Sequence, residues 1–263
     1  MDRNRFLKMA DNPDFIPGIF NYFDRWCERC PLSSRCFLFA TEKEMRSGQV
    51  AGGRSNEDLW KEIHEAFDLT MDLVSDLAQE QGIDPATLDL DEETNWLEVQ
   101  GRGTKESPLV QAAAHYASLA AEWLTNNATL LEQEQIDSQD GRSPDIGDDS
   151  SIAGSIRSAL EIVQWYQHFI RVKLMRALDG GLMNADDGKC DDDFPSDVDG
   201  SAKVALIGID RSIGAWERLQ GLRGDPGQDA MEILIHLRRL RTAVEKHFIH
   251  VRSFVRPGFD QEV

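Results

Sequence analysis

Apolar residues recur every three or four positions along most of the chain, and this spacing predicts helices. Alternating β-branched runs and Asn-Gly turns, which mark strands and hairpins, do not occur in the sequence. The chain is therefore predicted to be all-α, with a bundle of four to five long helices. The long helices are expected over about residues 55–82, 107–133, 151–178, 201–222 and 225–254.

Glycine and proline give further expectations about these helices. Pro108 suits the first turn of the second helix, and Gly180-Gly181 is expected to end the third. Gly208 and Gly214 lower the helix propensity of the fourth, so we expect another backbone to approach closely at both positions.

The apolar stripes differ in width between helices. The third helix has two stripes and the fourth is apolar on most sides, so both are expected to be surrounded by other helices. The first and fifth helices have single stripes, which could serve a homodimer. The stripe of the first consists of Trp60, Ile63, Phe67, Met71, Val74, Leu77 and Ala78, and that of the fifth of Ile233, Leu237, Leu240, Val244, Phe248 and Val251.

The N-terminal part of the chain has a different composition. Residues 14–47 are its most aromatic stretch, and a glycine-rich break follows at residues 48–53. We therefore predict a Cys-rich aromatic arm over residues 1–50, packed on a helical bundle over residues 54–256.

Three of the four cysteines lie in this arm, as Cys27-x2-Cys30-x5-Cys36. Thiolates bind zinc and iron–sulfur clusters, and the metal lowers thiol pKa values enough to ionise them. The spacing supplies three ligands. The fourth would be Cys190, a histidine, a carboxylate or water. Arg25, Arg29 and Arg35 are expected to offset the negative charge of the thiolates.

Two other interpretations of the cysteines stay open. The thiols can be small buried hydrophobic groups on an aromatic face. Cys27 and Cys30 can also form a redox-active pair, although the βα context of thioredoxin-like proteins is missing.

Polar residues within the predicted helices form pairs seven positions apart, which places each pair on one helix face. A metal or catalytic site inside the bundle is one interpretation, as in ferritin-like di-iron proteins. Their Glu-x-x-His motif does not occur in this sequence. The alternative is an ion-pair network with Arg171, Lys173, Arg211 or Arg218. The three candidate pairs are His115 with Glu122, Glu161 with His168, and Asp210 with Glu217.

Charge and hydropathy limit the classes of partner. Of 263 residues, 47 are acidic and 28 basic, which gives a net charge of −19. Phosphate backbones and anionic membranes attract Lys and Arg, so nucleic acid and membrane surfaces are not expected partners. The sequence contains neither an apolar run of membrane-spanning length nor a signal-peptide pattern, so we expect a cytoplasmic chain with reduced thiols.

Two functional hypotheses follow from the sequence. The first is an intracellular helical-bundle protein that binds zinc or an iron–sulfur cluster through Cys27, Cys30 and Cys36, with metal-dependent redox activity if the interior site is catalytic. The second is a non-enzymatic helical scaffold or regulatory protein, with structural cysteines and a buried ion-pair network. The sequence identifies no substrate.

Overall fold

The computed structural model of the chain describes residues 3–47, 56–83, 104–127, 152–187, 197–221 and 228–260. These residues form helices and connecting turns without any strand, so the all-α prediction is confirmed. The chain divides into two compact units, Met1–Leu97 with Arg256–Val263, and Glu98–Val255. This division differs from the predicted ranges 1–50 and 54–256, which stay a prediction.

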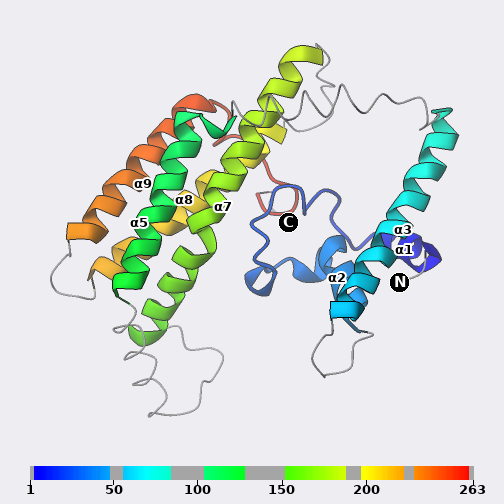
Figure 1. Cartoon of the computed structure of the whole chain (residues 1–263), viewed down its shortest axis with the longest axis horizontal. Coiled ribbons are helices and arrows are strands. Elements are labelled where there is room, and N and C mark those ends of the chain that lie inside the picture. The colour runs from blue at the N-terminus through cyan, green and yellow to red at the C-terminus, as the bar shows by residue number, and fades with distance from the viewer. Residues whose placement is uncertain are drawn as a thin grey trace. The chain divides into compact units, whose positions relative to one another are not determined.

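The second unit contains four long helices that pack on one another (Figure 1). Both α5 and α8 contact α7 and α9, so the four helices form a closed ring around a shared core. Their bounds are Pro108–Asn126 for α5, Ile152–Asp187 for α7, Asp197–Gly221 for α8 and Gln228–His247 for α9.

Helix α8 is buried on most of its sides, as its composition predicts. Trp216, which is fully buried, packs against Trp123 of α5 with the ring centroids 5.0 Å apart. The Trp216 indole N–H donates a hydrogen bond of 3.3 Å to the Tyr116 hydroxyl, which joins α8 to α5 across the core. Burial raises the pKa of Tyr116. Other buried side chains of α8 are Val204, Leu206, Ile209, Ile213 and Leu219.

Helices α7 and α8 approach closely at Gly208. A Cβ atom at this position would lie 2.9 Å from Cδ1 of Tyr166 and 3.2 Å from Cγ1 of Ile170. The close approach at Gly208 is thus made by side chains of α7, whereas the prediction was of an approaching backbone. At Gly214 the prediction is wrong, because a Cβ there would have no atom within 4 Å.

Helix α7 differs from its prediction in length and in burial. Gly180-Gly181 does not end it, since the helix continues to Asp187. Its first stripe is largely buried, with Val163, Tyr166 and Ile170 inaccessible to solvent. Its second stripe is only partly covered, since Ile162 and Phe169 are half-buried whereas Trp165 is 37% and Val172 is 60% exposed.

Helix α9 ends at His247, seven residues before the predicted end. The chain then turns, with Val251 N–H bonded to the Phe248 carbonyl. The Lys203 ammonium of α8 donates a 2.9 Å hydrogen bond to the Arg252 carbonyl and holds this turn on α8. The apolar seam of α9 from Ile233 to Val244 is buried, so it is not available to a second molecule.

The first unit combines short helices and 3₁₀ turns with one long helix, α3, in the residues that the structure describes. These elements are α1 (Arg3–Ala10), the 3₁₀ turns η1 (Cys27–Arg29) and η2 (Ser33–Arg35), α2 (Phe37–Ser47) and α3 (Asn56–Gln81). Phe37 of α2 packs edge-on against Phe6 of α1 and against Phe15, with centroid distances of 5.2 and 5.9 Å. An aromatic cluster thus joins α1, α2 and the loop between them.

Gly258, near the C-terminus, packs against the loop that contains Ile16 and Ile19 in the first unit. Gly258 has a φ of +75°, which a residue with a side chain rarely adopts. A Cβ there would lie only 2.9 Å from Cδ1 of Ile16 and 3.4 Å from Cδ1 of Ile19. Gly258 therefore allows the chain to turn against Ile16 and the buried Ile19.

Helix α3 forms over Asn56–Gln81, as predicted, and its apolar stripe faces solvent. Trp60 is 61% exposed and Phe67 is 62% exposed. Ile63, Met71, Val74 and Leu77 are also exposed. A 26-residue helix with one continuous apolar face is typical of a surface that another helix covers.

Candidate functional site

The cysteines lie in two 3₁₀ turns at the start of α2. Cys30 N–H bonds to the Cys27 carbonyl at 3.2 Å, and Cys36 N–H bonds to the Ser33 carbonyl at 3.3 Å. Ile16 N–H bonds to the Arg35 carbonyl at 3.0 Å and closes the loop that contains both turns. All three cysteines are free thiols; Cys27 and Cys30 are half-buried and Cys36 is buried.

The charges around Cys27 favour a protonated thiol. Burial raises the pKa of Cys27, and the negative groups of Glu42, Cys36, Glu28 and Cys30 raise it further. Cys27 is thus close enough to the other two cysteines to be affected by their charge. A raised pKa is the reverse of what an activated redox cysteine needs, and the redox-active Cys27–Cys30 pair stays a prediction.

The nearby arginines contact groups other than the thiols. Arg25 forms an ion pair of 2.8 Å with Glu42, and the Arg29 guanidinium lies 4.4 Å from the Trp26 ring centroid. Arg35 donates a 3.3 Å hydrogen bond to the Asp14 carbonyl. These contacts do not involve the cysteines, so the role of the three arginines in balancing thiolate charge stays a prediction.

The cysteines do not form a complete metal site. No group of three or more Cys, His, Asp or Glu side chains in the described residues is arranged to hold a metal ion. Cys190, the predicted fourth thiol, lies outside the described residues. The residues present offer thiols of the right chemistry, but the fit to a metal or cluster is incomplete.

The carboxylates of α8 pair with arginines. Asp210 contacts Arg252 at 2.9 Å and Arg241 at 3.6 Å. Glu217 contacts Arg238 at 2.7 Å. These arginines are not the ones that were predicted to pair with the carboxylates. The ion pairs lie at the partly exposed edge of α8, since the side chain of Asp210 is 34% exposed and that of Glu217 is 49% exposed.

The other four candidate residues lie on α5 and α7. His115 is exposed and packs edge-on against His236, whose Nε2 lies 2.8 Å from the Ala112 carbonyl oxygen. His168 is exposed and Glu161 is half-buried on α7. Exposed Glu122 borders a cavity of about 160 Å³ between α5 and α9. The six candidates thus form no common interior site among the described residues.

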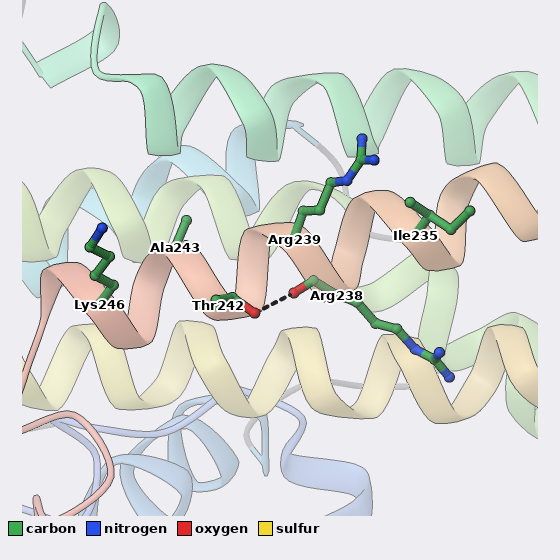
Figure 2. A pocket seen from close by; sticks show the side chains of 6 residues that line it. All are labelled: Ile235, Arg238, Arg239, Thr242, Ala243 and Lys246. Atoms are coloured by element: carbon green, nitrogen blue, oxygen red, sulfur yellow. Dashed lines mark hydrogen bonds between the residues drawn. The ribbon is translucent and has the colours of Figure 1, made fainter.

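Sequence reasoning missed the outward face of α9. A shallow groove there is lined by residues at helical spacing, all from α9: Ile235, Arg238, Arg239, Thr242, Ala243 and Lys246 (Figure 2). Three of the six are cations and none is acidic. The signal was present in the sequence as Arg238-Arg239 with Lys246 two turns further on.

Comparisons with known proteins identify no family for this chain. No protein-family model, curated protein or solved structure matches the chain. Within the described ranges, none of the helices combines the length and the apolar character needed to cross a membrane.

Proposed function

We propose that this chain is a non-enzymatic helical interaction protein, in which packed helices form a scaffold that carries surfaces for other proteins. The exposed apolar stripe of α3 is the observation that carries the proposal. Monomeric proteins rarely expose a contiguous apolar patch of this kind, and such patches usually mark binding surfaces. Trp60 and Phe67 on this stripe are also of the residue types that dominate binding energy at interfaces.

The arrangement of polar residues supports a scaffold rather than an enzyme. Asp210 and Glu217 are each bound by arginine, and half-exposed ion pairs of this kind fix helix register more than they stabilise the fold. The core between the helices is occupied by Trp216, Tyr116 and aliphatic side chains. A bundle built this way, with the Cys-rich segment as an attached arm, is the architecture that we propose for the whole chain.

Paired substitutions on α3 test the interaction role. Phe67→Gln alters the stripe, and Asp72→Asn alters the opposite face of the same helix. We expect the wild-type chain and Asp72→Asn to elute from gel filtration of a native extract well above the mass of a single chain. Phe67→Gln is expected to shift toward that mass. Elution of the wild type as a single chain, or equal behaviour of both variants, contradicts the proposal.

A second candidate function is binding of zinc or an iron–sulfur cluster by Cys27, Cys30 and Cys36. The specific observation in its favour is that the Cys27 thiol is affected by the charges of both other cysteines. A bound metal would replace the thiol protons. Free thiols also support a reducing compartment, and we propose the cytoplasm.

Metal analysis of the anaerobically purified chain tests this second function. One zinc, or iron with visible absorption, is expected in the wild type and is expected to be absent from Cys30→Ser. Cys190→Ser tests the fourth ligand: retention of the metal excludes Cys190, and loss of the metal identifies it as a ligand. Metal-free wild-type protein with three titratable thiols in the described arm rules the function out.

A further inference from the structure

The groove on α9 is a basic surface on an acidic protein. Arg238 is paired with Glu217, but no ion pair of Arg239 or Lys246 is found within the described part of the chain. Figure 2 shows Arg239 and Lys246 projecting from the same side of α9 as Ile235 and Ala243. Met231 and Ile235, each 43% exposed, continue this side with apolar surface. The outward face of α9 is therefore both apolar and cationic from Ile235 to Lys246, whereas Glu232, one turn before Ile235, is an exposed carboxylate.

Helix α3 has the complementary character. It contains eight acidic residues and one lysine, and its apolar stripe is exposed along its length. At about 100° per residue, Glu57 and Asp68 fall on one border of the stripe, and Glu80 falls on the other. All three side chains are exposed. The outward face of α3 is therefore both apolar and anionic.

We propose that the exposed stripe of α3 packs on the outward face of α9 of a second copy of this chain. The proposal rests on the interaction role proposed above and names its partner. Each chain offers both surfaces, so two copies related by a two-fold axis form the contact twice, with α3 of each molecule on α9 of the other. Apolar side chains form the centre of each contact, and the borders pair carboxylates with Arg239 and Lys246.

The charges indicate which face of a second copy α3 meets. Two chains of net charge −19 repel each other at long range, but salt screens this repulsion beyond about 10 Å at ordinary ionic strength. Contacts between carboxylates and guanidinium or ammonium groups act at shorter range and are screened less. A symmetric contact of α3 with α3 would instead bring two strongly acidic helices together, which favours α9 as the docking face.

Exchange of charges between the two faces tests the proposal on the full chain. Variant A carries Arg239→Glu and Lys246→Glu, and variant B carries Glu57→Lys and Asp68→Lys. In sedimentation velocity of the purified proteins, we expect a dimer for the wild type and single chains for A and for B. An equimolar mixture of A and B restores complementary charges on both contacts, and we expect it to form dimers again.

Matched controls carry the same change of charge outside the two faces. Glu65→Lys with Asp72→Lys alters the polar side of α3, and Lys105→Glu with Arg218→Glu alters cations that do not line the groove. Both controls are expected to sediment as dimers, and circular dichroism checks that all variants are folded.

The proposal is overturned if the wild type sediments as a single chain, or if A and B stay single chains when mixed. A monomeric wild type that still elutes as a large complex from the extract would leave the interaction role intact and remove only the second copy as partner.

Discussion

At the scale of single residues, two glycines of α8 have opposite roles. Gly208 faces Tyr166 and Ile170 of α7, whereas Gly214 has open space around it. Both were equivalent in the sequence, because helix propensity alone does not report what lies opposite a residue. Packing between helices therefore determines which of the two glycines can be replaced by a larger residue.

Alanine substitutions separate these two roles. At Gly208, overpacking against Tyr166 is expected to cost about 1–3 kcal/mol, which exceeds the roughly 1 kcal/mol that alanine gains in helix propensity. At Gly214 only the gain applies, so Gly214→Ala is expected to raise the free energy of unfolding by about 0.5–1 kcal/mol. Urea denaturation measures the change in the free energy of unfolding for each substitution, provided that the m value is unchanged. Equal stabilisation by the two substitutions would contradict the close approach of α7 and α8 at Gly208.

The Cys27 thiol gives a second prediction at this scale. Its pKa lies above the ordinary value of 9.0, because burial and then Glu42 disfavour the thiolate. The folded chain therefore holds this proton more tightly than the unfolded chain, and the thiol contributes a loss of stability as the pH rises above 9.0.

Alkylation of Cys27 in metal-free protein measures this shift. The rate is expected to reach half its plateau at a higher pH in the folded chain than in urea, and Glu42→Gln is expected to lower that pH. Glu44→Gln on the same helix serves as the control. A midpoint at or below that of the unfolded chain is incompatible with the raised pKa.

At the scale of elements, hydrophobic periodicity predicted which residues form the long helices, but not where those helices end. The ends depend on contacts that lie far apart in sequence. Helix α9 stops before the turn that Lys203 of α8 holds through the Arg252 carbonyl. Helix α7 continues through Gly180-Gly181, where Asp197 and Val198 of α8 lie beside Gly180. Helix α1 was not predicted, and its packing depends on Phe6 and Phe37.

The candidate site was predicted less well than the fold, and the reason is physical. A seven-residue spacing places Asp210 and Glu217 on one face of α8, but it does not state which neighbouring side chain meets that face. Arg238 lies 21 residues after Glu217, and Arg252 lies 42 residues after Asp210. Both reach the rim of α8 only because α9 and the turn that follows it pack beside α8. The cysteine spacing indicated that the three cysteines lie near one another. It did not indicate that Glu42 and Glu28 raise the pKa of Cys27.

Helices α3 and α9 use their apolar residues differently, and this difference is testable. Leu237 is fully buried in the seam of α9, so Leu237→Ala is expected to cost about 2–5 kcal/mol at any protein concentration. Phe67 is exposed on α3, so Phe67→Gln is expected to change the stability of a single chain by less than about 0.5 kcal/mol.

Thermal unfolding at several protein concentrations distinguishes the two effects. If α3 is covered by a partner chain, the deficit in Tm caused by Phe67→Gln increases with protein concentration, because association stabilises only the wild type. The deficit caused by Leu237→Ala is expected to change much less. A concentration-independent effect of Phe67→Gln places this side chain in the fold of the single chain.

At the scale of the whole molecule, the second unit has a well-formed core, whereas the described residues of the first unit include few buried side chains. The buried residues of the first unit include Ile19, Tyr22 and Cys36, whereas the second unit has buried residues along each of its four long helices. A unit with so small a core gains stability from what it binds, whether a metal at the cysteines or a partner along α3. We therefore propose that the first unit carries binding surfaces at the cysteines and along α3, and that the second unit supplies the well-packed core and the docking face of α9.

The most direct test of this account is site-specific photocross-linking from α3 in living cells. A photoreactive phenylalanine analogue replaces Phe67 on the stripe or, as the control, Asp72 on the opposite face. The account predicts a discrete adduct from position 67 at the mass of two chains, and little or none from position 72. Absence of any adduct from position 67, or equal adducts from both positions, would contradict the claim that the exposed face of α3 is a binding surface.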